Sequence, residues 1–391
     1  MVIKMKIAVI GGGASGLFLS SYLMRKYKNI NITIFDKNKS LGRKLLATGN
    51  GKCNFSNFKA LPSDYNNEEF INKLFNKCSK EELINYFSSL GLMFYFDEEG
   101  RMYPISNSSQ TILNLFLLDL KGANVKLETT VNNIYQKNNK VYVNDLEFDY
   151  AVMSSGSNAS IDIKKCDSTY NYFKNLNLKF VKLRPSLVGF KSSDKDINIL
   201  KGYRSKGVVS LIRNNKIIFN EYGEIIFKED GISGIVIMNA SHYYEDGDEL
   251  RINLLPNIDL NELFYKIENR KKENTNPNYY LEPIFHNQII SYLVKKNILD
   301  TKDIIGLLSN FNPLIRSTYD IKDSQVLKGG IDVSEIDDDF RLKKYNLIFA
   351  TGEVLDINGL CGGYNLMFAF MSALVCAKKI GEIYENKNNK L

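Results

Sequence analysis

Three glycines near the start of the chain, Gly11, Gly13 and Gly16, stand at the spacing of a dinucleotide-binding turn. In the pattern G-x-G-x-x-G the first glycine makes a tight turn, the second lets the backbone approach a pyrophosphate, and the third lets a helix pack on a strand. Asp36 stands 20 residues after Gly16, where an acid can hydrogen-bond the ribose hydroxyls. Its charge repels a 2′-phosphate. These residues predict a dinucleotide site.

A second glycine-rich stretch stands near the other end of the chain. A nicotinamide dehydrogenase can bind its cofactor with the first motif alone, so this second stretch needs another explanation. A cofactor held from both ends of the chain favours tightly bound FAD. The second stretch comprises Gly352-Glu353-Val354-Leu355-Asp356 and Gly362-Gly363-Tyr364-Asn365-Leu366.

The residues around the first motif have the patterns of a strand, a helix and a second strand. Residues 5–10 are a short apolar run, as in a buried parallel strand, and residues 14–27 read as a helix. The free N–H groups and positive dipole end of that helix favour phosphate. A second strand over 31–35 leads to Asp36. The alternative to a dinucleotide site is a glycine turn that binds no ligand. The order of strand, turn, helix and strand that leads to Asp36 favours the dinucleotide site over this alternative.

The length and composition of the chain narrow the classes of protein to which it can belong. The chain has 391 residues, of which 44% are hydrophobic, and this length predicts two or three lobes. No apolar stretch approaches the roughly 20 residues that span a bilayer, and we expect neither a membrane span nor a signal peptide. Five widely spaced cysteines form no C-x-x-C pair, which predicts a cytoplasmic protein without disulfides. His242 and His286 lack partners at ligand spacing, so we expect no metal site.

The net charge of +7 is spread thinly. Its small clusters are Lys164-Lys165, Arg270-Lys271-Lys272 and Lys295-Lys296. Solvated faces are the simpler interpretation, and attraction to an anionic substrate or to RNA is the alternative.

The secondary-structure pattern changes along the chain. A first lobe alternates helices and strands, whereas short strands separated by glycines follow from about residue 187. The expected helices cover 67–90, 108–121 and 364–384, and residues 258–310 are expected to be mostly helical with asparagine-rich breaks at 274–278. The expected strands cover 124–136, 140–144, 147–153, 187–193, 207–213, 216–221, 224–227, 234–238, 324–327 and 346–350, with a hairpin over 92–104 and a loop over 37–57.

The run from Gly42 to Asn54, together with the second glycine-rich stretch, resembles the YhiN/BaiN-like flavoproteins, an aminoacetone-oxidase-type family of NAD(P)/FAD-dependent enzymes. The resemblance covers nearly the whole chain and includes 100–106, 222–227, 231–234 and 329–331. It implies an α/β fold: a discontinuous, glutathione-reductase-like Rossmann domain for FAD, with an inserted β-barrel-like domain and a small helical domain. The corresponding boundaries are 1–186 and 323–391 for the FAD domain, 187–257 for the β-rich insert, 258–310 for the helical subdomain and 311–322 for a return strand.

The resemblance also implies contacts for individual residues. It places the first motif at the pyrophosphate, Asp36 at the adenosine ribose, Val131 at the adenine, the 42–54 loop beside the cofactor, and the second stretch at the ribityl chain and isoalloxazine. The cofactor-binding residues expected are Gly11, Gly13, Ala14, Gly16, Asp36, Lys37, Arg43, Lys44, Thr48, Gly49, Gly51, Cys53, Asn54, Val131, Gly352, Glu353, Asp356, Gly362, Gly363, Tyr364, Asn365 and Leu366.

Several residues depart from the family pattern. Met153-Ser154-Ser155-Gly156 replaces a glycine-rich run, residues 158–177 hold few glycines, Cys361 replaces a threonine, and Met367-Phe368 replaces Gln-Trp. We expect these changes close to the flavin or its access route. No catalytic base stands out. Cys361 and Tyr364 are weak candidates, with packing as the alternative for each, and Cys53 is expected to pack within its loop.

Three functions remain open. The first is a FAD-dependent oxidoreductase that passes a hydride between NAD(P)H or a small organic substrate and an acceptor. The second is a NAD-dependent dehydrogenase that uses the first motif alone. The third is a flavoprotein whose main role is to bind RNA or another macromolecule. A second G-x-G-x-x-G fingerprint is absent, so either NAD(P)H or the substrate itself can reduce the flavin.

Overall fold

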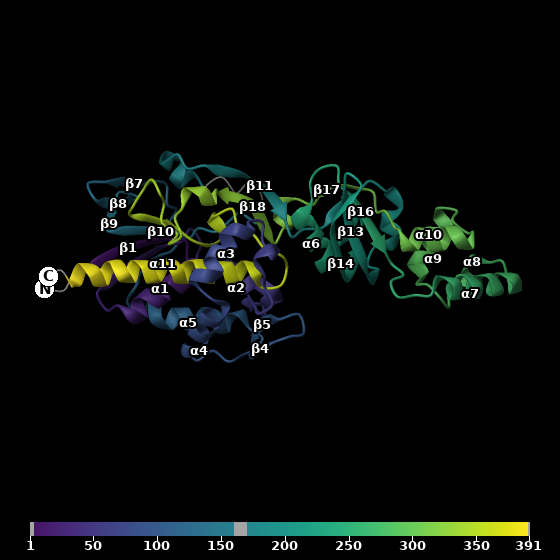
Figure 1. Cartoon of the computed structure of the whole chain (residues 1–391), viewed down its shortest axis with the longest axis horizontal. Helices are drawn as coiled ribbons and strands as arrows, with labels where there is room; N and C mark the ends of the chain where they lie inside the picture. The colour runs from purple at the N-terminus through teal and green to yellow at the C-terminus, as the bar shows by residue number, and fades with distance from the viewer. Residues whose placement is uncertain (1–3, 160–169, 390–391) are drawn as a thin grey trace. The chain divides into compact units, whose positions relative to one another are not determined.

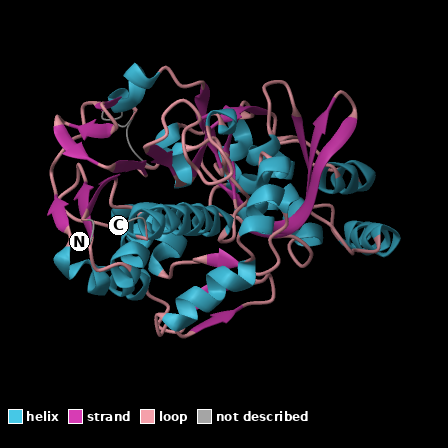
Figure 2. Cartoon of the chain, turned by 60° about the vertical axis from the view of Figure 1, so that its left-hand side comes forward, coloured by secondary structure: helices cyan, strands magenta, loops and turns pink. Residues whose placement is uncertain are grey.

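A computed structural model describes residues 4–159 and 170–389 of the chain (Figure 1). The residues up to Arg184 and those from Leu327 form one compact unit, which we call the terminal unit, and Pro185–Val326 form a second, the inserted unit. Helices and strands mix in both (Figure 2). Within the described ranges, no helix is long and apolar enough to cross a membrane.

A parallel sheet organises the terminal unit. Its strand order is β19-β10-β1-β2-β6, and all neighbouring strands run parallel. Ile10 pairs with Phe35 on one side and with Met153 on the other, and Met153 pairs with Ala350. Phe35 also pairs with Lys126 of β6, so all five strands end level with one another. The strands are β1 (Met5–Ile10), β2 (Ile30–Phe35), β6 (Asn124–Lys126), β10 (Tyr150–Met153) and β19 (Ile348–Ala350).

Helices pack around this sheet through a shared core. The Phe18 ring of α1 lies 5.8 Å from Phe116 of α5 and 5.4 Å from Phe370 of α11, centroid to centroid. The predicted 67–90 helix is two helices, because the backbone leaves the helical conformation at Cys78 and Ser79 caps the second. The helices are α1 (Ala14–Lys26), α3 (Glu68–Lys77), α4 (Lys80–Ser89), α5 (Ser109–Asp119) and α11 (Tyr364–Asn388).

Smaller sheets complete the terminal unit. Residues 147–153, predicted as one strand, divide at Asp149: β9 closes a small antiparallel meander, and β10 enters the parallel sheet. Residues 124–136 likewise divide into β6 and β7. The paired strands β11 and β18 carry the chain between the units. The strands are β3 (Ser56–Asn57), β4 (Phe94–Phe96), β5 (Arg101–Pro104), β7 (Ile134–Lys137), β8 (Lys140–Val143), β9 (Leu146–Phe148), β11 (Phe180–Ser186) and β18 (Val326–Ile331).

The 37–57 segment, predicted as a loop, contains a short helix, α2 (Arg43–Ala47), and a 3₁₀ turn over Thr48–Gly51. Leu45 is buried and anchors the helix. Gly49 and Asn50 adopt left-handed backbone angles directly after it, and this conformation prevents the helix from continuing. The loop prediction missed one buried turn because a single apolar anchor gives no periodicity.

The inserted unit has its own hydrophobic core, shared by an antiparallel sheet and a group of helices. The sheet order is β16-β13-β14-β15-β12-β17, and β14 is one long strand where two were predicted. The strands are β12 (Phe190–Ser192), β13 (Arg204–Arg213), β14 (Lys216–Phe227), β15 (Gly231–Ser233), β16 (Glu249–Asn253) and β17 (Ile315–Thr318). The helices are α7 (Leu260–Glu273), α8 (Pro277–Leu281), α9 (Asn287–Lys295) and α10 (Thr301–Ser309).

The strand predicted over 234–238 is wrong, because α6 (Ile235–Tyr243) occupies this segment. Gly234 has a φ of +112°, and a Cβ there would lie 2.2 Å from the Glu224 carbonyl oxygen. The chain therefore turns away from the sheet at Gly234. Val236 and Ile237 then bury on the face of β13 and β14. A short apolar run fits a buried helix as well as a strand, and packing decides between them.

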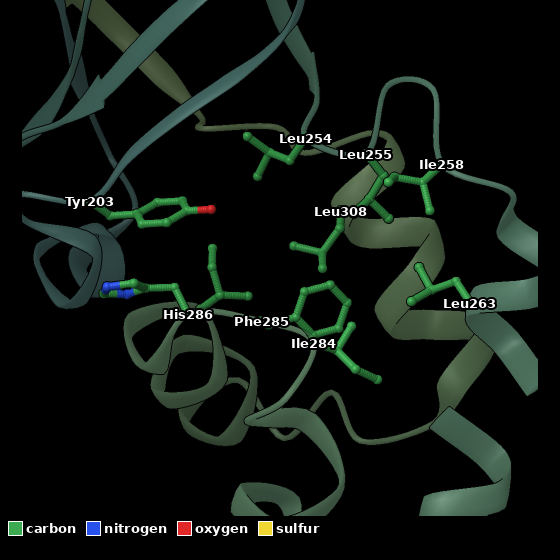
Figure 3. Close-up of a pocket in the computed structure, with 10 residues that line it drawn as sticks. Tyr203, Leu254, Leu255, Ile258, Leu263, Ile284, Phe285, His286 and Leu308 are labelled. Carbon is green, nitrogen blue, oxygen red and sulfur yellow. The ribbon is translucent and has the colours of Figure 1, made fainter. Parts of the chain in front are cut away.

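A cavity of about 210 Å³ opens within the inserted unit (Figure 3). Its walls are mostly apolar and include Leu254, Phe285 and Leu308. The Tyr203 hydroxyl points into it, and the His286 ring lies 5.3 Å from the Tyr203 ring. His286 Nδ1 accepts a hydrogen bond from the Gln288 N–H and caps α9, which gives this histidine a structural role.

Candidate functional site

The first glycine motif lies where the strands of the parallel sheet end. The Gly11 N–H donates to the Phe35 carbonyl oxygen at 2.8 Å, which closes the turn after β1. A Cβ on Gly11 would lie 2.4 Å from the Ser154 carbonyl oxygen, and one on Gly16 would lie 2.1 Å from the Gly11 carbonyl oxygen. Both neighbours are backbone atoms. The close packing of turn, helix and strand therefore requires glycine at both positions.

The N-terminus of α1 is open for an anion. No side chain caps it, and no acid stands in its first turn. A Cβ built on Gly13 meets nothing within 4 Å, in contrast to its neighbours in the motif. Unpaired N–H groups at a helix start attract phosphate oxygens, so Gly13 and Ala14 fit a pyrophosphate.

The Asp36 carboxylate forms a hydrogen bond with the backbone of this turn. Its Oδ2 accepts from the Gly12 N–H at 2.9 Å, and its Oδ1 accepts from the N–H and the Nδ2 of Asn38 at 2.8 and 2.9 Å. A carboxylate can accept about four hydrogen bonds, so capacity remains for a ribose hydroxyl. The Thr129 N–H donates to the Asp36 carbonyl oxygen, which brings the segment before Val131 to the same end of the sheet.

The 42–54 loop lies against the first motif. The Gly42 N–H donates to the Gly12 carbonyl oxygen at 2.8 Å. Lys44 Nζ donates to the Ser157 carbonyl oxygen at 2.7 Å and lies 3.4 Å from Glu353 Oε2. Arg43 instead donates to Asn38 Oδ1 at 3.0 Å. Lys44 therefore joins three segments that are distant in sequence.

The end of this loop has unusual backbone angles. Gly49, Asn50, Gly51 and Cys53 all have positive φ. Cys53 is fully buried, and burial raises the pKa of its thiol to about 12. A thiol at that pKa stays protonated at neutral pH and is a poor nucleophile. Cys53 is thus a packing residue of the loop.

The two glycine-rich stretches meet in the folded chain. The hydroxyls of Ser15 and Thr351 are 2.6 Å apart, which joins the start of α1 to the end of β19. A Cβ on Gly363 would lie 2.4 Å from the Ser56 carbonyl oxygen. Asn57 Nδ2 donates to the Gly362 carbonyl oxygen at 2.9 Å. The 42–57 segment therefore links the first stretch to the second.

Glu353 carries a carboxylate with spare acceptor capacity. Its Oε2 faces Lys44, whereas its Oε1 is buried and has no hydrogen-bond partner in the described structure. Buried polar atoms normally have partners, so an unmatched one marks a place for a ligand. This acceptor fits the hydroxyl-rich ribityl chain of FAD.

The side chains of the second stretch mainly shape its loop. Asn365 accepts from the Gly359 N–H at 2.9 Å and donates to the Gly359 carbonyl oxygen at 3.0 Å. Asp356 Oδ1 accepts from the Gly329 N–H at 2.8 Å, and burial raises the pKa of this carboxyl. The Tyr65 hydroxyl donates to the Tyr364 carbonyl oxygen.

These contacts leave the start of α11 open. Gly363 caps it without a side-chain hydrogen bond, and its first turn holds no acid. The positive end of the helix dipole at this start favours negative charge beside it, such as that of a reduced flavin. Cys361 and Tyr364 flank this end and are both partly exposed.

The departures from the family pattern have different surroundings. Ser154 Oγ donates to the Gly11 carbonyl oxygen at 3.0 Å, so it supports the first turn. Ser155 Oγ lies 3.1 Å from the Tyr172 hydroxyl. Met367 and Phe368 are buried in the core. Residues 160–169, including Cys166 and Lys164-Lys165, lie outside the described residues.

Some site residues escaped the sequence reasoning. Ser15, Asn57 and Ser157 join the stretches through hydrogen bonds, but none stands in a diagnostic spacing. Of these three residues, only Ser15 lies within the first motif, so only its position indicated a place in the site. The contacts of the other two exist only once distant segments meet.

The fold and this site define a Rossmann-type protein of the FAD-binding class. Residues 5–379 match the family model described as the HI0933-like protein Rossmann domain, and the chain belongs to that family. The predicted family, the FAD-binding Rossmann fold and the class of FAD-dependent oxidoreductase are thereby confirmed.

Curated relatives match over nearly their whole length. The chain is 26% identical to a 3-dehydro-bile acid delta(4,6)-reductase of Clostridium scindens, over 96% of this chain and 99% of that protein. It is 24% identical to ribosomal RNA dihydrouridine synthases of Haemophilus influenzae and of Escherichia coli. Both alignments cover 95% of this chain and 97% of the relative.

Proposed function

We propose that this protein reduces a carbon–carbon double bond conjugated to a carbonyl group, with NAD(P)H as the diffusible reductant. The observation that carries the proposal is the contact between the Ser15 and Thr351 hydroxyls, because it joins the two glycine-rich stretches to which we assign the pyrophosphate and the flavin. The names of the relatives support the reaction class. A bile acid with unsaturation at positions 4 and 6 and a uracil ring both carry such a bond.

In this reaction bound FAD supplies the hydride, which goes to one carbon of the double bond, and a proton goes to the neighbouring carbon. The open start of α11 stabilises negative charge at the adjoining end of the cofactor. Lys44 and Glu353, which lie 3.4 Å apart between the two stretches, would hold the middle of the cofactor. Tyr364 and Cys361 are our candidates for the proton donor, since both are partly exposed beside this helix start.

The reductant and the location of the reaction are part of the proposal. NAD(P)H would have to reduce the flavin without a second dinucleotide fingerprint, since the sequence has only one. We place the reaction in the cytoplasm, because the cysteines of the described residues (Cys53, Cys78, Cys361 and Cys376) are free thiols.

A second candidate function is the reduction of a base within RNA, which extends the RNA-binding hypothesis. The charge distribution favours it. Residues 185–326 carry 18 lysines and arginines against 19 acids, so the excess of positive charge lies in the terminal unit, with the cofactor residues. The 37–63 segment alone holds six basic residues and no acid. In the basic clusters of the insert, Lys271 donates to the Leu299 carbonyl oxygen and Lys296 pairs with Asp194.

Anaerobic reduction of the purified protein tests the proposal. We expect a yellow protein whose flavin is bleached by NADH or NADPH and is reoxidised by a cyclic enone or by a uridine-containing RNA. A colourless protein, with no flavin released on denaturation, contradicts the cofactor assignment. A flavin that NAD(P)H reduces but that only oxygen reoxidises contradicts the proposed reaction.

A further inference from the structure

One arginine lies on the open face of the small sheet β3-β5-β4. Along β5 the side chains alternate: Arg101 and Tyr103 are partly exposed, whereas Met102 and Pro104 are buried. Alternate residues of a strand point to opposite faces, so one face of this sheet lies in the core and the other is open. Tyr95 pairs with Tyr103 across the strands, and their rings stack at 5.7 Å. These two tyrosines therefore share the open face with Arg101.

Arg101 lies beside the second glycine-rich stretch. On β3, Asn57 pairs with Arg101, and its Nδ2 donates to the Gly362 carbonyl oxygen at 2.9 Å. A Cβ built on Gly362 would lie 3.2 Å from Tyr364 Cε2 and 3.7 Å from Arg101 Cδ. The Arg101 side chain and the Tyr364 ring thus approach the same glycine, which belongs to the stretch that we assign to the flavin.

The Arg101 guanidinium keeps unused hydrogen-bond donors. Its Nε donates to Asp97 Oδ2 at 2.7 Å, and its Nη2 donates to Glu99 Oε2 at 2.9 Å. Within the described ranges, Nη1 makes neither a hydrogen bond nor an ion pair. The side chain is 26% exposed, so the two carboxylates orient the guanidinium without covering it. A guanidinium has more N–H donors than these two bonds use, and those of Nη1 can bind an acceptor.

A second arginine of the terminal unit shows what such a turn requires by itself. Arg341 Nε donates to Asp337 Oδ2 at 3.2 Å, and Asp337 Oδ1 accepts from the N–H groups of Asp339 and Arg341. Asp97 accepts the same three bonds at the tip of the β4–β5 hairpin. The bond between arginine and aspartate is therefore a feature of the turn. The position beside Gly362 and the unused Nη1 are what the turn does not explain in Arg101.

The charges around Arg101 favour an uncharged partner. The 94–104 hairpin carries three acids and one arginine. This excess of negative charge repels a carboxylate, a phosphate or a nucleic-acid strand. A neutral carbonyl oxygen can accept a hydrogen bond from Nη1 without such repulsion. The stacked rings of Tyr95 and Tyr103 offer apolar surface to the rest of the same molecule.

We propose that Arg101 binds the carbonyl oxygen of a small uncharged enone and stabilises the negative charge that this oxygen gains during reduction. The inference rests on the proposed function and names the residue that holds the substrate. When a hydride reaches the far carbon of the double bond, the electron pair of that bond moves towards the oxygen, which becomes an enolate. A proton then adds to the carbon beside the carbonyl, and the carbonyl forms again. A donor placed at the developing oxyanion stabilises the transition state more than the ground state.

Anaerobic stopped-flow mixing of the flavin-loaded, reduced protein with cyclohexenone tests the proposal. Arg101→Met should slow the reoxidation of the flavin by the enone about a hundredfold, because the oxyanion loses its donor. Reduction by NAD(P)H and reoxidation by oxygen should keep the rates of the unchanged protein, since neither needs a donor to a carbonyl. Arg101→Lys should restore part of the enone rate, because an ammonium group donates without the planar fork. A cyclohexenone that carries a carboxylate should react more slowly than cyclohexenone itself.

Arg341→Met is the matched control, because it breaks the same kind of bond at a remote turn. Asp339 of that turn pairs with Lys379 at 3.2 Å, about four helical turns along α11 from its start. The control should keep the enone, NAD(P)H and oxygen rates of the unchanged protein.

Binding is measured apart from turnover. Cyclohexanone lacks the double bond, and its binding is followed by the change that it causes in the visible spectrum of the oxidised flavin. Arg101→Met should raise its dissociation constant about tenfold, through the loss of one hydrogen bond from a charged donor. Arg341→Met should leave this constant unchanged.

The outcomes separate this inference from the proposed function. Equal enone rates and equal ketone affinities for the two methionine variants, or no ketone binding by the unchanged protein, overturn the role of Arg101. If the unchanged protein binds the ketone through Arg101 but does not reduce the enone, the proposed function falls and the Arg101 site stands. Loss of flavin from Arg101→Met, with all of it retained in Arg341→Met, overturns the inference in favour of a cofactor contact. Faster reoxidation by a uridine-containing RNA than by the enone overturns the uncharged class of substrate.

Discussion

The terminal and inserted units are built for different tasks. The terminal unit has a parallel sheet, two open helix starts and a buried carboxylate oxygen without a partner. The inserted unit has an antiparallel sheet, an apolar cavity and nearly balanced charge. A parallel sheet gathers strand ends at one edge, and loops from distant segments can then surround a ligand there. An antiparallel sheet connects neighbouring strands by short turns, so it brings fewer loops from distant segments together at one edge.

The largest expected difference between the units concerns glycine. Gly16→Val should abolish flavin retention and destabilise the protein by about 1–3 kcal/mol or more, because the new side chain meets the backbone oxygen of Gly11 at 2.1 Å. The measurement is flavin absorbance per protein, together with denaturant unfolding. As the control in the inserted unit, Gly306→Ala has open space within α10, and should keep all flavin and leave stability equal or slightly higher. Full flavin retention by the Gly16 variant would contradict the assignment of the first glycine motif to the cofactor.

A smaller difference concerns ion pairs. Glu353→Gln should raise the dissociation constant for FAD about tenfold, or about 1.4 kcal/mol, because the carboxylate between Lys44 and the cofactor loses its charge. Titration of the apoprotein with FAD measures this. Lys201→Met breaks the exposed Lys201–Glu229 pair of the inserted unit, at 2.8 Å, and should change neither FAD affinity nor stability by more than about 1 kcal/mol. Equal FAD affinities for the two variants would remove Glu353 from the site.

The smallest effect concerns thiols, which within the described ranges all belong to the terminal unit. In the native protein at mildly alkaline pH, iodoacetamide should modify Cys361, which is partly exposed, and leave Cys53 unmodified. Burial holds the pKa of Cys53 at about 12, so its reactive thiolate appears only as the pH rises towards that value. Mass spectrometry of the digested protein identifies the labelled residue. Rapid labelling of Cys53 would show that the 48–54 loop opens.

Much of the fold was predictable from local patterns. The strand, turn and helix around Gly11 to Gly16, the strand before Asp36 and the long helix after Gly363 lie within a residue or two of their predicted ends, apart from the last turn of that helix. Each has a clear apolar pattern bounded by glycine or a turn. The errors fell where patterns were short. The helix over 235–243 was predicted as a strand, and the division at Asp149 was missed, because neither was resolved by periodicity.

The site was predictable in part. The sequence indicated the two glycine-rich stretches and the 42–54 loop, and which of the proposed contact residues touch FAD stays a prediction. The partners of Lys44 and Asn365 could not be foreseen, because a charge or an amide can bond to any segment that folding brings near. Lys271 and Lys296, in the basic clusters of the insert, make internal contacts that the sequence could not indicate, and whether these clusters bind an anion stays a prediction.

By itself the sequence determined the chemistry at each end of the chain: a glycine turn followed by an acid, and a second glycine-rich stretch that a simple dehydrogenase does not need. Only the tertiary structure decided that the two ends lie in contact. The level ends of β1, β2, β10 and β19 bring segments more than 300 residues apart into contact, and the hydrogen bond from Ser15 to Thr351 joins them. Sequence spacing carries no information about such contacts, because strand order in the sheet sets them.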